Sequence, residues 1–298
     1  MNISAIVTVP PYASFLDEVA AHPLVSGFRL NTVMPVRGGP CEALERLNKY
    51  GQPLWVDLKG RQLRVAGAAI PPFTEVQLSH KIQVQTPVDA YFSDGNERVK
   101  IVAVDGDRII LEDGPRRLIG PGESVNIIHQ SLEIEGMLTK TDKAYLSAMK
   151  ETGLTKIMLS YVESAYDVGE VKNILPDAEV VLKIETQRGL SFAREHGAKH
   201  GRLMAARGDL FVEVLRPHRI IDAVKTIVRA DKEAIVASRI FDSLAWQAVP
   251  VSADIGDVAF LLEIGYRTFM LGDQVCLKRD SVLEALNLLK ALAESEVS

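Results

Sequence analysis

The sequence predicts an α/β protein, a (β/α)8 TIM barrel with a small antiparallel β domain inserted after strand 3. Two observations lead to this prediction. Eight short runs rich in β-branched residues alternate with segments of helical periodicity along the 298 residues, as βαβ units around a parallel sheet do. One stretch, from about residue 65 to residue 125, breaks this alternation and carries repeated turn signals instead.

The eight runs are the expected barrel strands, and helical segments lie between them. The segment 139–153 begins at the capping residue Thr139 and ends at Gly153, and the segment 279–294 carries leucines at helical spacing. In such barrels the active site lies at the carboxyl ends of the strands, which directs the search for functional residues. The strands are expected at 3–9, 25–31, 53–58, 155–160, 179–185, 201–206, 233–238 and 266–271.

The turn sequences SDG, VDGD and EDG separate alternating segments within the stretch that lacks helical periodicity. This pattern is typical of a small antiparallel β domain. We therefore expect residues 1–64 and 126–298 to form the barrel and residues 65–125 to form the inserted domain. Because the insertion follows the third strand, it should hang over the carboxyl face of the barrel as a lid.

Composition and charge exclude several classes of protein. With 47% hydrophobic and 24% charged residues the chain is globular, and a net charge of -5 without basic clusters gives no footprint for nucleic acid. No run reaches the ~18 apolar residues of a membrane span, and no signal peptide is recognisable, so we expect a cytoplasmic protein without membrane contact. Cys41 and Cys276 are expected to be free thiols.

Charged residues interrupt the apolar pattern at the start of the stretch VLKIETQRGL (181–190). Lys183 and Glu185 point the same way because strand side chains alternate, while Ile184 takes the other face. Asp209 follows the next run directly, beside Gly208. Two carboxylates at this rim suit a hard divalent ion such as Mg2+. A buried structural ion pair is the alternative for Lys183 and Glu185 alone; Asp209 favours the functional interpretation.

Further polar residues follow other strands. Arg29 and Asn31 end the second run, Asp57 lies in the third, and Ser238 ends the seventh. Cations around a metal suit an anionic, phosphorylated or carboxylated substrate. Taken individually, residues such as Arg29 and Ser238 more often cap strand ends than bind ligands. His196 and His200 have helical spacing without a carboxylate partner, and they are interpreted as a solvated helix end; the sequence contains no GxGxxG motif and no phosphate-binding loop.

The motifs resemble those of the pyruvate kinase family. VLKIETQRGL followed by GRLMAARGDLFVEV is similar to the family's lysine, x, glutamate strand and its ARGDL strand end. In the same order along the chain, GFRLNTV, LWVDLKGRQLR, YVESAYDVGEVKNIL, AIVASRIFDSL and GYRTFMLGDQV resemble other segments of that barrel. The resemblance covers nearly the whole chain, and the KIE and ARGDL motifs are its specific part.

The resemblance implies roles for the strand-end residues. Lys183 would stabilise the enolate of pyruvate and the phosphoryl group in flight, and Arg29 would bind the transferring phosphate. Glu185 and Asp209 would bind Mg2+, or Mn2+ in its place. The backbone at Gly208 and Asp209 would bind the substrate carboxylate. These roles agree with the chemistry of the residues, because a metal and fixed cations stabilise charge that develops on an enolate oxygen and a phosphoryl group.

The resemblance also implies roles for other positions, on less specific motifs. Ser238 would bind substrate with its hydroxyl where the family has threonine, and Asp94 resembles the acidic residue of the family's lid. Asn31 and Arg64 are candidate nucleotide contacts. The resemblance also implies phosphoenolpyruvate or pyruvate as substrate, ADP or ATP as a possible partner, and a possible homodimer.

The sequence departs from the family in the part of the site that holds potassium and nucleotide. Asn31 and Asp57 of the potassium site remain, but Val33 and Leu58 replace its hydroxyl residues, so potassium should not be required. The loop VMPV (33–36) replaces a serine, histidine, glycine run, and the lid is shorter. The chain also stops where the barrel stops, from which we expect no C-terminal regulatory domain.

Three functions follow from these features. The first is a Mg2+-dependent phosphotransferase that moves phosphate between phosphoenolpyruvate and ADP or another acceptor. The second is a Mg2+-dependent aldolase or carbon-carbon lyase that uses a pyruvate enolate, which the altered loop at 33–37 favours. The third is a non-catalytic protein that binds phosphoenolpyruvate, which the retained Lys183 argues against. Arg29 and the lid favour the first.

Overall fold

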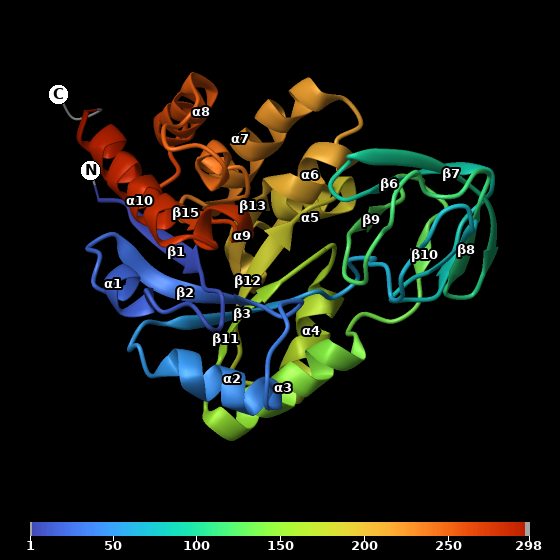
Figure 1. Ribbon diagram of the computed structural model, residues 1–298, viewed down its shortest axis with the longest axis horizontal. Coiled ribbons are helices and arrows are strands. Elements are labelled where there is room, and N and C mark those ends of the chain that lie inside the picture. Colours follow the sequence, from blue (N-terminus) through green and yellow to red (C-terminus); the bar gives the residue numbers. More distant parts are fainter. Residues whose placement is uncertain (1, 296–298) are drawn as a thin grey trace.

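The computed structural model describes residues 2–295, and its centre is a closed barrel of parallel strands (Figure 1). Neighbouring strands follow the order β1-β15-β14-β13-β12-β11-β3-β2. The TIM barrel predicted from the sequence is confirmed, and each of the eight predicted runs forms a barrel strand. The strands are β1 (Ser4–Thr8), β2 (Val25–Asn31), β3 (Leu54–Leu58), β11 (Lys156–Leu159), β12 (Glu179–Ile184), β13 (Arg202–Ala206), β14 (Ile235–Ala237) and β15 (Thr268–Leu271).

Helices surround the barrel and connect its strands. The ends of α3 follow the sequence signals, because Thr139 and Asp142 form a reciprocal capping box and Gly153 ends the helix at a φ of 71°. The α-helices are α1 (Leu16–Ala20), α2 (Gly39–Asn48), α3 (Lys140–Thr152), α4 (Ala165–Ile174), α5 (Gln187–His196), α6 (Arg207–Glu213), α7 (Ile220–Ala230), α8 (Ser252–Glu263), α9 (Asp273–Cys276) and α10 (Arg279–Ser295); short 3-10 helices are η1 (Gly197–His200), η2 (Pro217–Arg219) and η3 (Asp242–Ala245).

The insertion after β3 folds as antiparallel sheet and projects from one side of the barrel (Figure 1). One sheet has the order β4-β8-β7-β6-β9, and β10 pairs with β5 in a second. Since this pairing reaches Ile134, we propose that the inserted domain runs from residue 65 to about residue 134, past the boundary expected at residue 125. Its strands are β4 (Glu75–Gln77), β5 (Ile82–Gln83), β6 (Val88–Phe92), β7 (Glu97–Asp105), β8 (Arg108–Leu111), β9 (Val125–Asn126) and β10 (Glu133–Ile134).

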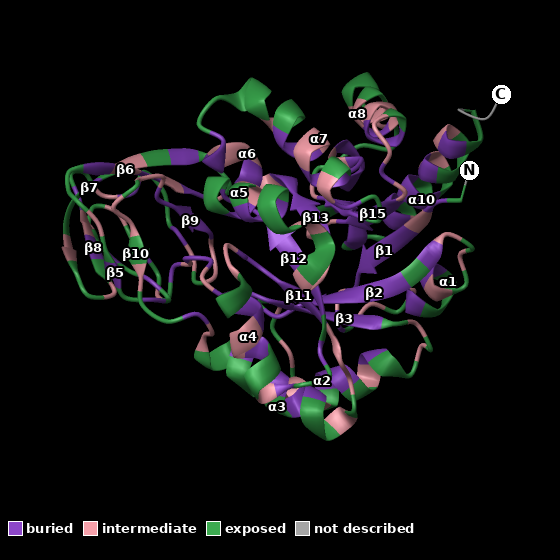
Figure 2. Ribbon diagram, turned by 180° about the vertical axis from the view of Figure 1, so that it is seen from behind, coloured by how far each residue is buried: buried purple, intermediate pink, exposed green. Residues whose placement is uncertain are grey.

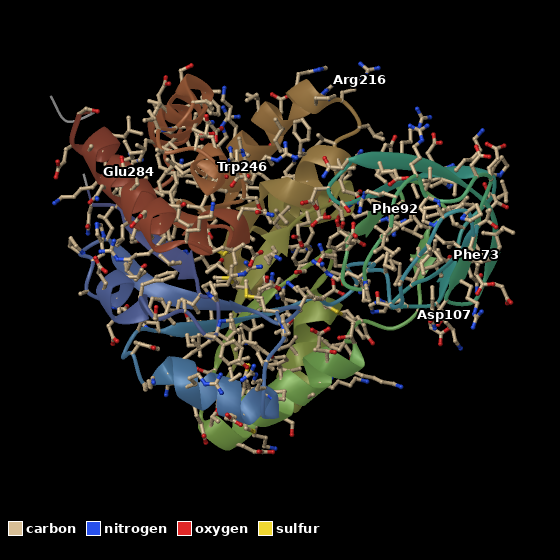
Figure 3. The ribbon with its side chains drawn as sticks, viewed as in Figure 1. Phe73, Phe92, Asp107, Arg216, Trp246 and Glu284 are labelled. Atoms are coloured by element: carbon tan, nitrogen blue, oxygen red, sulfur yellow. The ribbon has the colours of Figure 1, made fainter. Side chains whose placement is uncertain are left out.

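The inserted domain has a hydrophobic core separate from that of the barrel. Phe92 is fully buried inside it, whereas Phe73 lies at its outer edge (Figure 3). The burial colours show buried residues along the barrel strands and exposed residues on the outer helix faces (Figure 2). Among residues 2–295, no helix has the length and apolar character that crossing a membrane requires.

The barrel interior is itself packed, and this packing positions the site. Ile6, Trp55, Met158, Val181 and Met204 belong to one interior cluster. Leu182 and Ile184, on the opposite face of β12, join the outer core between strands and helices. Side chains alternate between the two faces of β12. Lys183 and Glu185 therefore lie on the same face as Val181, closer to the mouth of the barrel.

Candidate active site

Lys183 lies above the interior core and contacts three side chains: Ser160 after β11, Asp57 on β3 and Glu185 directly after its own strand β12. Its Nζ donates to Ser160 Oγ at 2.6 Å and lies 3.2 Å from Asp57 Oδ1 and 3.3 Å from Glu185 Oε1. Burial alone would lower the pKa of Lys183, but the carboxylates of Asp57 and Glu185 outweigh it and raise the pKa above its usual value. Lys183 is therefore a buried, permanently charged ammonium at the mouth of the barrel.

Tyr161 connects the two carboxylates that the sequence predicts as metal ligands. Its backbone N–H donates to Glu185 Oε2 at 2.8 Å, and its hydroxyl donates to Asp209 Oδ1 at 3.1 Å. Gln62 Nε2 donates to Asp209 Oδ2 at 2.6 Å. Burial raises the pKa of Glu185 to about 7, with Lys183 opposing the shift and Asp209 adding to it. Glu185 and Asp209 thus belong to one hydrogen-bonded cluster.

Glu213 adds a third carboxyl group to this cluster. Asn126 Nδ2 lies within hydrogen-bonding distance of three acceptors: Tyr161 Oη at 2.6 Å, Asp209 Oδ1 at 3.1 Å and Glu213 Oε1 at 3.2 Å. Asp209 and Glu213 share one side of α6 because they lie four residues apart. Burial raises the pKa of Glu213 to about 8. We call Glu185, Asp209 and Glu213 the carboxylate side of the mouth.

The inserted domain reaches this side through the loop that carries Asp94. A Cβ atom placed on Gly208 would lie 3.8 Å from Asp94 Oδ2 and 3.5 Å from Ser238 Oγ, so Asp94, Gly208 and Ser238 converge. Ser124 Oγ donates to Asp94 Oδ1 at 3.0 Å. Burial raises the pKa of Asp94, and nearby Asp209 raises it further. The absence of a side chain at Gly208 leaves its backbone accessible between these groups.

On the opposite side, Asp57 is fully buried among three cations. Its Oδ2 accepts from Arg29 Nε at 3.0 Å and from Lys59 Nζ at 2.9 Å, and its Oδ1 faces Lys183. Burial would raise the pKa of Asp57, but Lys183, Lys59 and Arg29 hold it well below its usual value. Burial lowers the pKa of Lys59 to about 7. The negative charge of Asp57 is therefore balanced by cationic side chains of the same chain.

Asp273, the first residue of α9, engages the predicted phosphate and nucleotide contacts on this side. Arg29 Nη1 lies 3.2 Å from both of its carboxylate oxygens, and Asn31 Nδ2 donates to Asp273 Oδ2 at 3.0 Å. Arg29 Nη1 also donates to Thr8 Oγ1 at 3.0 Å. We call Arg29, Asn31, Asp57 and Asp273 the arginine side.

Arg64, the other candidate nucleotide contact, forms hydrogen bonds with one residue just before the inserted domain and one residue within it. Its Nε donates to Gln62 Oε1 at 3.1 Å, and its Nη1 donates to the carbonyl of Gly122. His196, the last residue of α5, and His200, the last residue of η1, pack around the ring of Phe192.

The sequence analysis missed Gln62, Asn126, Tyr161 and Glu213 as members of the carboxylate cluster, and it missed Asp273 on the arginine side. The i, i+4 spacing of Asp209 and Glu213 was a signal that could have been used. The other residues come from elements distant in sequence, so no local pattern marked them.

The carboxylate side fits a hard divalent cation by the chemistry of its donors. Among the described residues, no group of three histidine, cysteine or acidic side chains has the arrangement of a protein-only metal cage. Mg2+ does not need one, because it binds through one or two carboxylates and completes its shell with water and substrate. Burial raises the pKa of Glu185, and a cation bound beside the carboxylate would favour its charged form and oppose this shift.

The chain is similar in sequence to known proteins of one family. The family model of the pyruvate kinase barrel domain matches residues 70–275. Pyruvate kinase of Methanocaldococcus jannaschii is 27% identical over 293 residues, covering 91% of this chain and 64% of that protein. Pyruvate kinase of Borreliella burgdorferi is 23% identical over 300 residues (91% and 62%), and a pyruvate kinase of Agrobacterium vitis is 27% identical over 325 residues (97% and 67%).

The chain spans about two thirds of the length of these relatives. The matched segment includes most of the inserted domain and the barrel strands β11 to β15, and with them Lys183 on β12, Glu185 directly after it and Asp209 on α6. With this match over more than half of its residues, the chain belongs to the pyruvate kinase family.

Proposed function

We propose that the chain is a Mg2+-dependent phosphotransferase that acts on phosphoenolpyruvate or pyruvate through an enolate. The observation that carries the proposal is the position of Lys183, a charged buried ammonium 3.3 Å from Glu185, in a mouth where Glu185 and Asp209 share Tyr161 as a hydrogen-bond donor. Family membership supports a kinase-type enzyme.

The residues of the chain would divide the work by their chemistry. Glu185 and Asp209 would hold Mg2+, which when bound neutralises charge on the enolate and phosphoryl oxygens. Lys183 would donate a charged hydrogen bond to the developing enolate oxygen. The backbone of Gly208 and Asp209 would bind the substrate carboxylate, and the Ser238 hydroxyl lies beside them. Arg29 would contact the transferring phosphate only after giving up part of its bonding to Asp273.

A direct test is to incubate the protein with Mg2+, phosphoenolpyruvate and ADP and to follow phosphorus by NMR. Formation of ATP or of another phosphorylated product is expected. If phosphoenolpyruvate stays intact with ADP and with a panel of alternative acceptors, the phosphotransferase proposal is wrong.

A carbon-carbon lyase is the second candidate, and the engagement of Arg29 by Asp57, Asp273 and Thr8 favours it, since a guanidinium bonded in this way is not free for phosphate. Both candidates need the enolate. Exchange of the pyruvate methyl protons in D2O with Mg2+, followed by proton NMR, tests the enolate step without any acceptor. Cleavage or formation of a pyruvate aldol adduct, without phosphoryl transfer, would select the lyase.

We further propose that potassium is not required. Asp57, one of the two retained residues of the family's potassium site, already faces Arg29, Lys59 and Lys183, and Asn31 donates to Asp273. Replacing potassium with tetramethylammonium should leave the exchange rate unchanged. A strong loss of rate in tetramethylammonium would contradict this proposal.

A further inference from the structure

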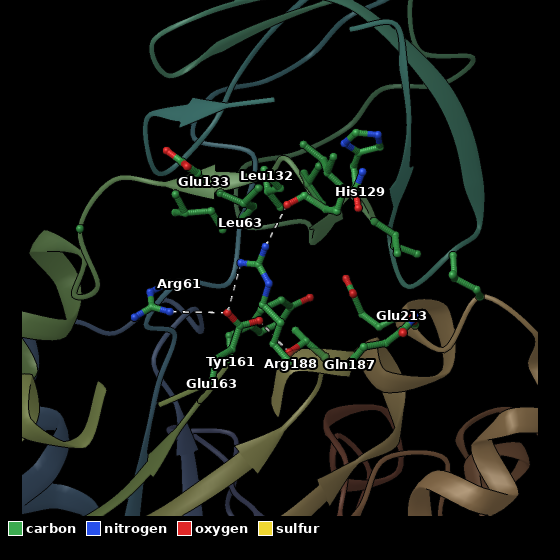
Figure 4. A pocket seen from close by; sticks show the side chains of 18 of the residues that line it. Arg61, Leu63, His129, Leu132, Glu133, Tyr161, Glu163, Gln187, Arg188 and Glu213 are labelled. Carbon is green, nitrogen blue, oxygen red and sulfur yellow. Dashed lines mark hydrogen bonds and ion pairs between the residues drawn. The ribbon is translucent and has the colours of Figure 1, made fainter. Parts of the chain in front are cut away.

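A cavity of about 690 Å³ lies between the inserted domain and the carboxyl ends of β11 and β12 (Figure 4). The residues assigned to substrate, metal or nucleotide do not line it, whereas Glu213 of the carboxylate side does. Its volume is in the range of cavities that hold small organic ligands, roughly 300 to 1,000 Å³.

One part of the wall on the side of the inserted domain is apolar, although His129, Gln130 and Glu133 of the same domain also line the cavity. The apolar part extends the hydrophobic core of that domain to the cavity surface and consists of Leu63, Val125, Ile127, Leu132 and Ile134. Leu132 and Ile134 are only half-buried, so their side chains retain apolar surface that a ligand can cover. This wall suits an apolar or aromatic ligand body.

The opposite wall is polar and carries balanced charge. Arg61 is bonded to Asp167 and lies 3.6 Å from Glu163, so its charge is neutralised within the barrel. Arg188 extends across the cavity to the inserted domain, where its Nη2 donates to the carbonyl of Gln130 at 3.2 Å (Figure 4). Arg188 also forms an ion pair with Glu163, which is long at 3.9 Å, and the Arg188 side chain is 59% exposed. Arg188 therefore has guanidinium N–H groups available for one anionic group.

The charge of the lining argues against a nucleotide. The cavity lining combines acidic and basic side chains. The acidic ones are Glu133, Glu163 and Glu213, and the basic ones are Arg61, Arg188 and His129. Sites for phosphate chains concentrate cations or backbone N–H groups from a glycine-rich loop, and this lining has neither.

Two residues connect the cavity to the proposed metal site. Tyr161 and Glu213 line the cavity, and both contact Asn126 Nδ2, which also donates to Asp209. Tyr161 in addition donates to Glu185 and Asp209 directly. A ligand that moves the Tyr161 ring would therefore move the hydroxyl that donates to the metal carboxylate Asp209.

We propose that this cavity binds a small organic ligand with an apolar body and a single negative charge, and that its occupation changes the affinity of the carboxylate side for Mg2+. The second half rests on the proposed function, because that function assigns the metal to Glu185 and Asp209. Coupling between two sites acts equally in both directions, which makes it measurable without catalysis.

The probe is 8-anilinonaphthalene-1-sulfonate (ANS), an aromatic body with one sulfonate, and binding is followed by its fluorescence. One saturable site is expected. Leu132→Trp, which fills the cavity, should weaken binding at least about 10-fold, whereas Leu118→Trp, at a 61% exposed position of the same domain outside the cavity, should not. Equal affinity in both variants would overturn the site, and near-ultraviolet circular dichroism checks that both are folded.

The charge assignment is tested with a matched pair of probes. Arg188→Gln should weaken ANS about 10-fold but leave its uncharged counterpart, N-phenyl-1-naphthylamine, unchanged. An equal loss for both probes would overturn the role of Arg188. ADP should not displace ANS, and stoichiometric displacement would overturn the ligand class.

The coupling is tested by titrating Mg2+ with and without saturating ANS. A change of about 5-fold in apparent Mg2+ affinity is expected, and Tyr161→Phe should reduce it. Unchanged Mg2+ affinity would overturn the coupling. Failure of Mg2+ to bind at all would sink the proposed function, while the Leu132→Trp comparison would still decide the cavity.

Discussion

On the arginine side of the barrel mouth the carboxylates of buried Asp57 and partly exposed Asp273 face cations, whereas on the carboxylate side the carboxylates face mostly neutral donors. Asp57 contacts Arg29, Lys59 and Lys183, and Asp273 contacts Arg29 and Asn31. Glu185, Asp209 and Glu213 instead receive hydrogen bonds from a backbone N–H, a phenol and side-chain amides, with Lys183 as the nearby cation of Glu185.

This difference separates a structural network from a site prepared for a ligand. Buried charges that are paired and hydrogen-bonded need nothing further, while buried carboxylates without matching cations raise one another's pKa and cost free energy. The pKa values follow the division: that of Asp57 is lowered, and those of Glu185 and Glu213 are raised to about 7 and about 8. A divalent cation would remove the cost on the second side.

The largest effect that would test this division is expected for Lys183→Met. The ammonium contacts Asp57 on one side and Glu185 on the other, and methionine fills a similar volume, so the exchange of pyruvate methyl protons should fall about 1,000-fold, or about 4 kcal/mol of transition-state stabilisation. Asp57 keeps Arg29 and Lys59, so the protein should still fold. Lys143→Met on the exposed face of α3 is the control. Undiminished exchange in Lys183→Met would remove the lysine from the mechanism.

The next effect concerns Mg2+ affinity. Glu185→Gln should weaken Mg2+ binding roughly 100-fold, about 2.7 kcal/mol, because a ligand charge is lost. In the unchanged protein, affinity should rise from pH 6 to pH 8 as the carboxyl with a pKa of about 7 loses its proton, and this rise should shrink in the variant. Isothermal titration calorimetry measures both. Glu179→Gln, exposed on the same strand, should behave as the unchanged protein, and an equal loss there would contradict the assignment.

The third effect is on stability without metal. Glu213 has a folded pKa of about 8, above its unfolded value, so its stabilising proton is lost as pH rises. The free energy of unfolding should fall by about 2 kcal/mol between pH 6 and pH 8 from this group. Urea unfolding at both pH values should show a smaller decrease in Glu213→Gln. The exposed change Glu195→Gln should keep the full decrease; a full decrease in Glu213→Gln as well would disprove the role of Glu213.

The smallest effect is expected on the arginine side. Asp273→Asn keeps an oxygen that can accept from Arg29, and Arg29 keeps Asp57, so the free energy of unfolding should fall by only about 1 kcal/mol. Urea unfolding compares it with Asp280→Asn, at a 91% exposed side chain. A loss several times larger would show that Asp273 is indispensable and that the charges of this side are not redundantly matched.

The sequence by itself determined the barrel, its eight strands and the placement of Lys183 and Glu185 at its mouth. These depend on local patterns: alternation along β12, turn signals in the insertion and capping residues such as Thr139 and Gly153 are written in neighbouring residues. The KIE and ARGDL motifs were local as well, and they identified the family that the comparisons confirm.

Only the tertiary structure decided which partners these residues have. Asp273 meets Arg29 across 244 positions and Asn126 meets Asp209 across 83, because barrel closure brings β15 beside β1 and the inserted domain folds back onto α6. The sequence predicted Arg29, Asn31 and Arg64 as ligand contacts, and the structure gives each an internal partner. Charge balance in a buried site is set by side chains that meet in space, and no pattern among neighbours along the chain encodes those meetings.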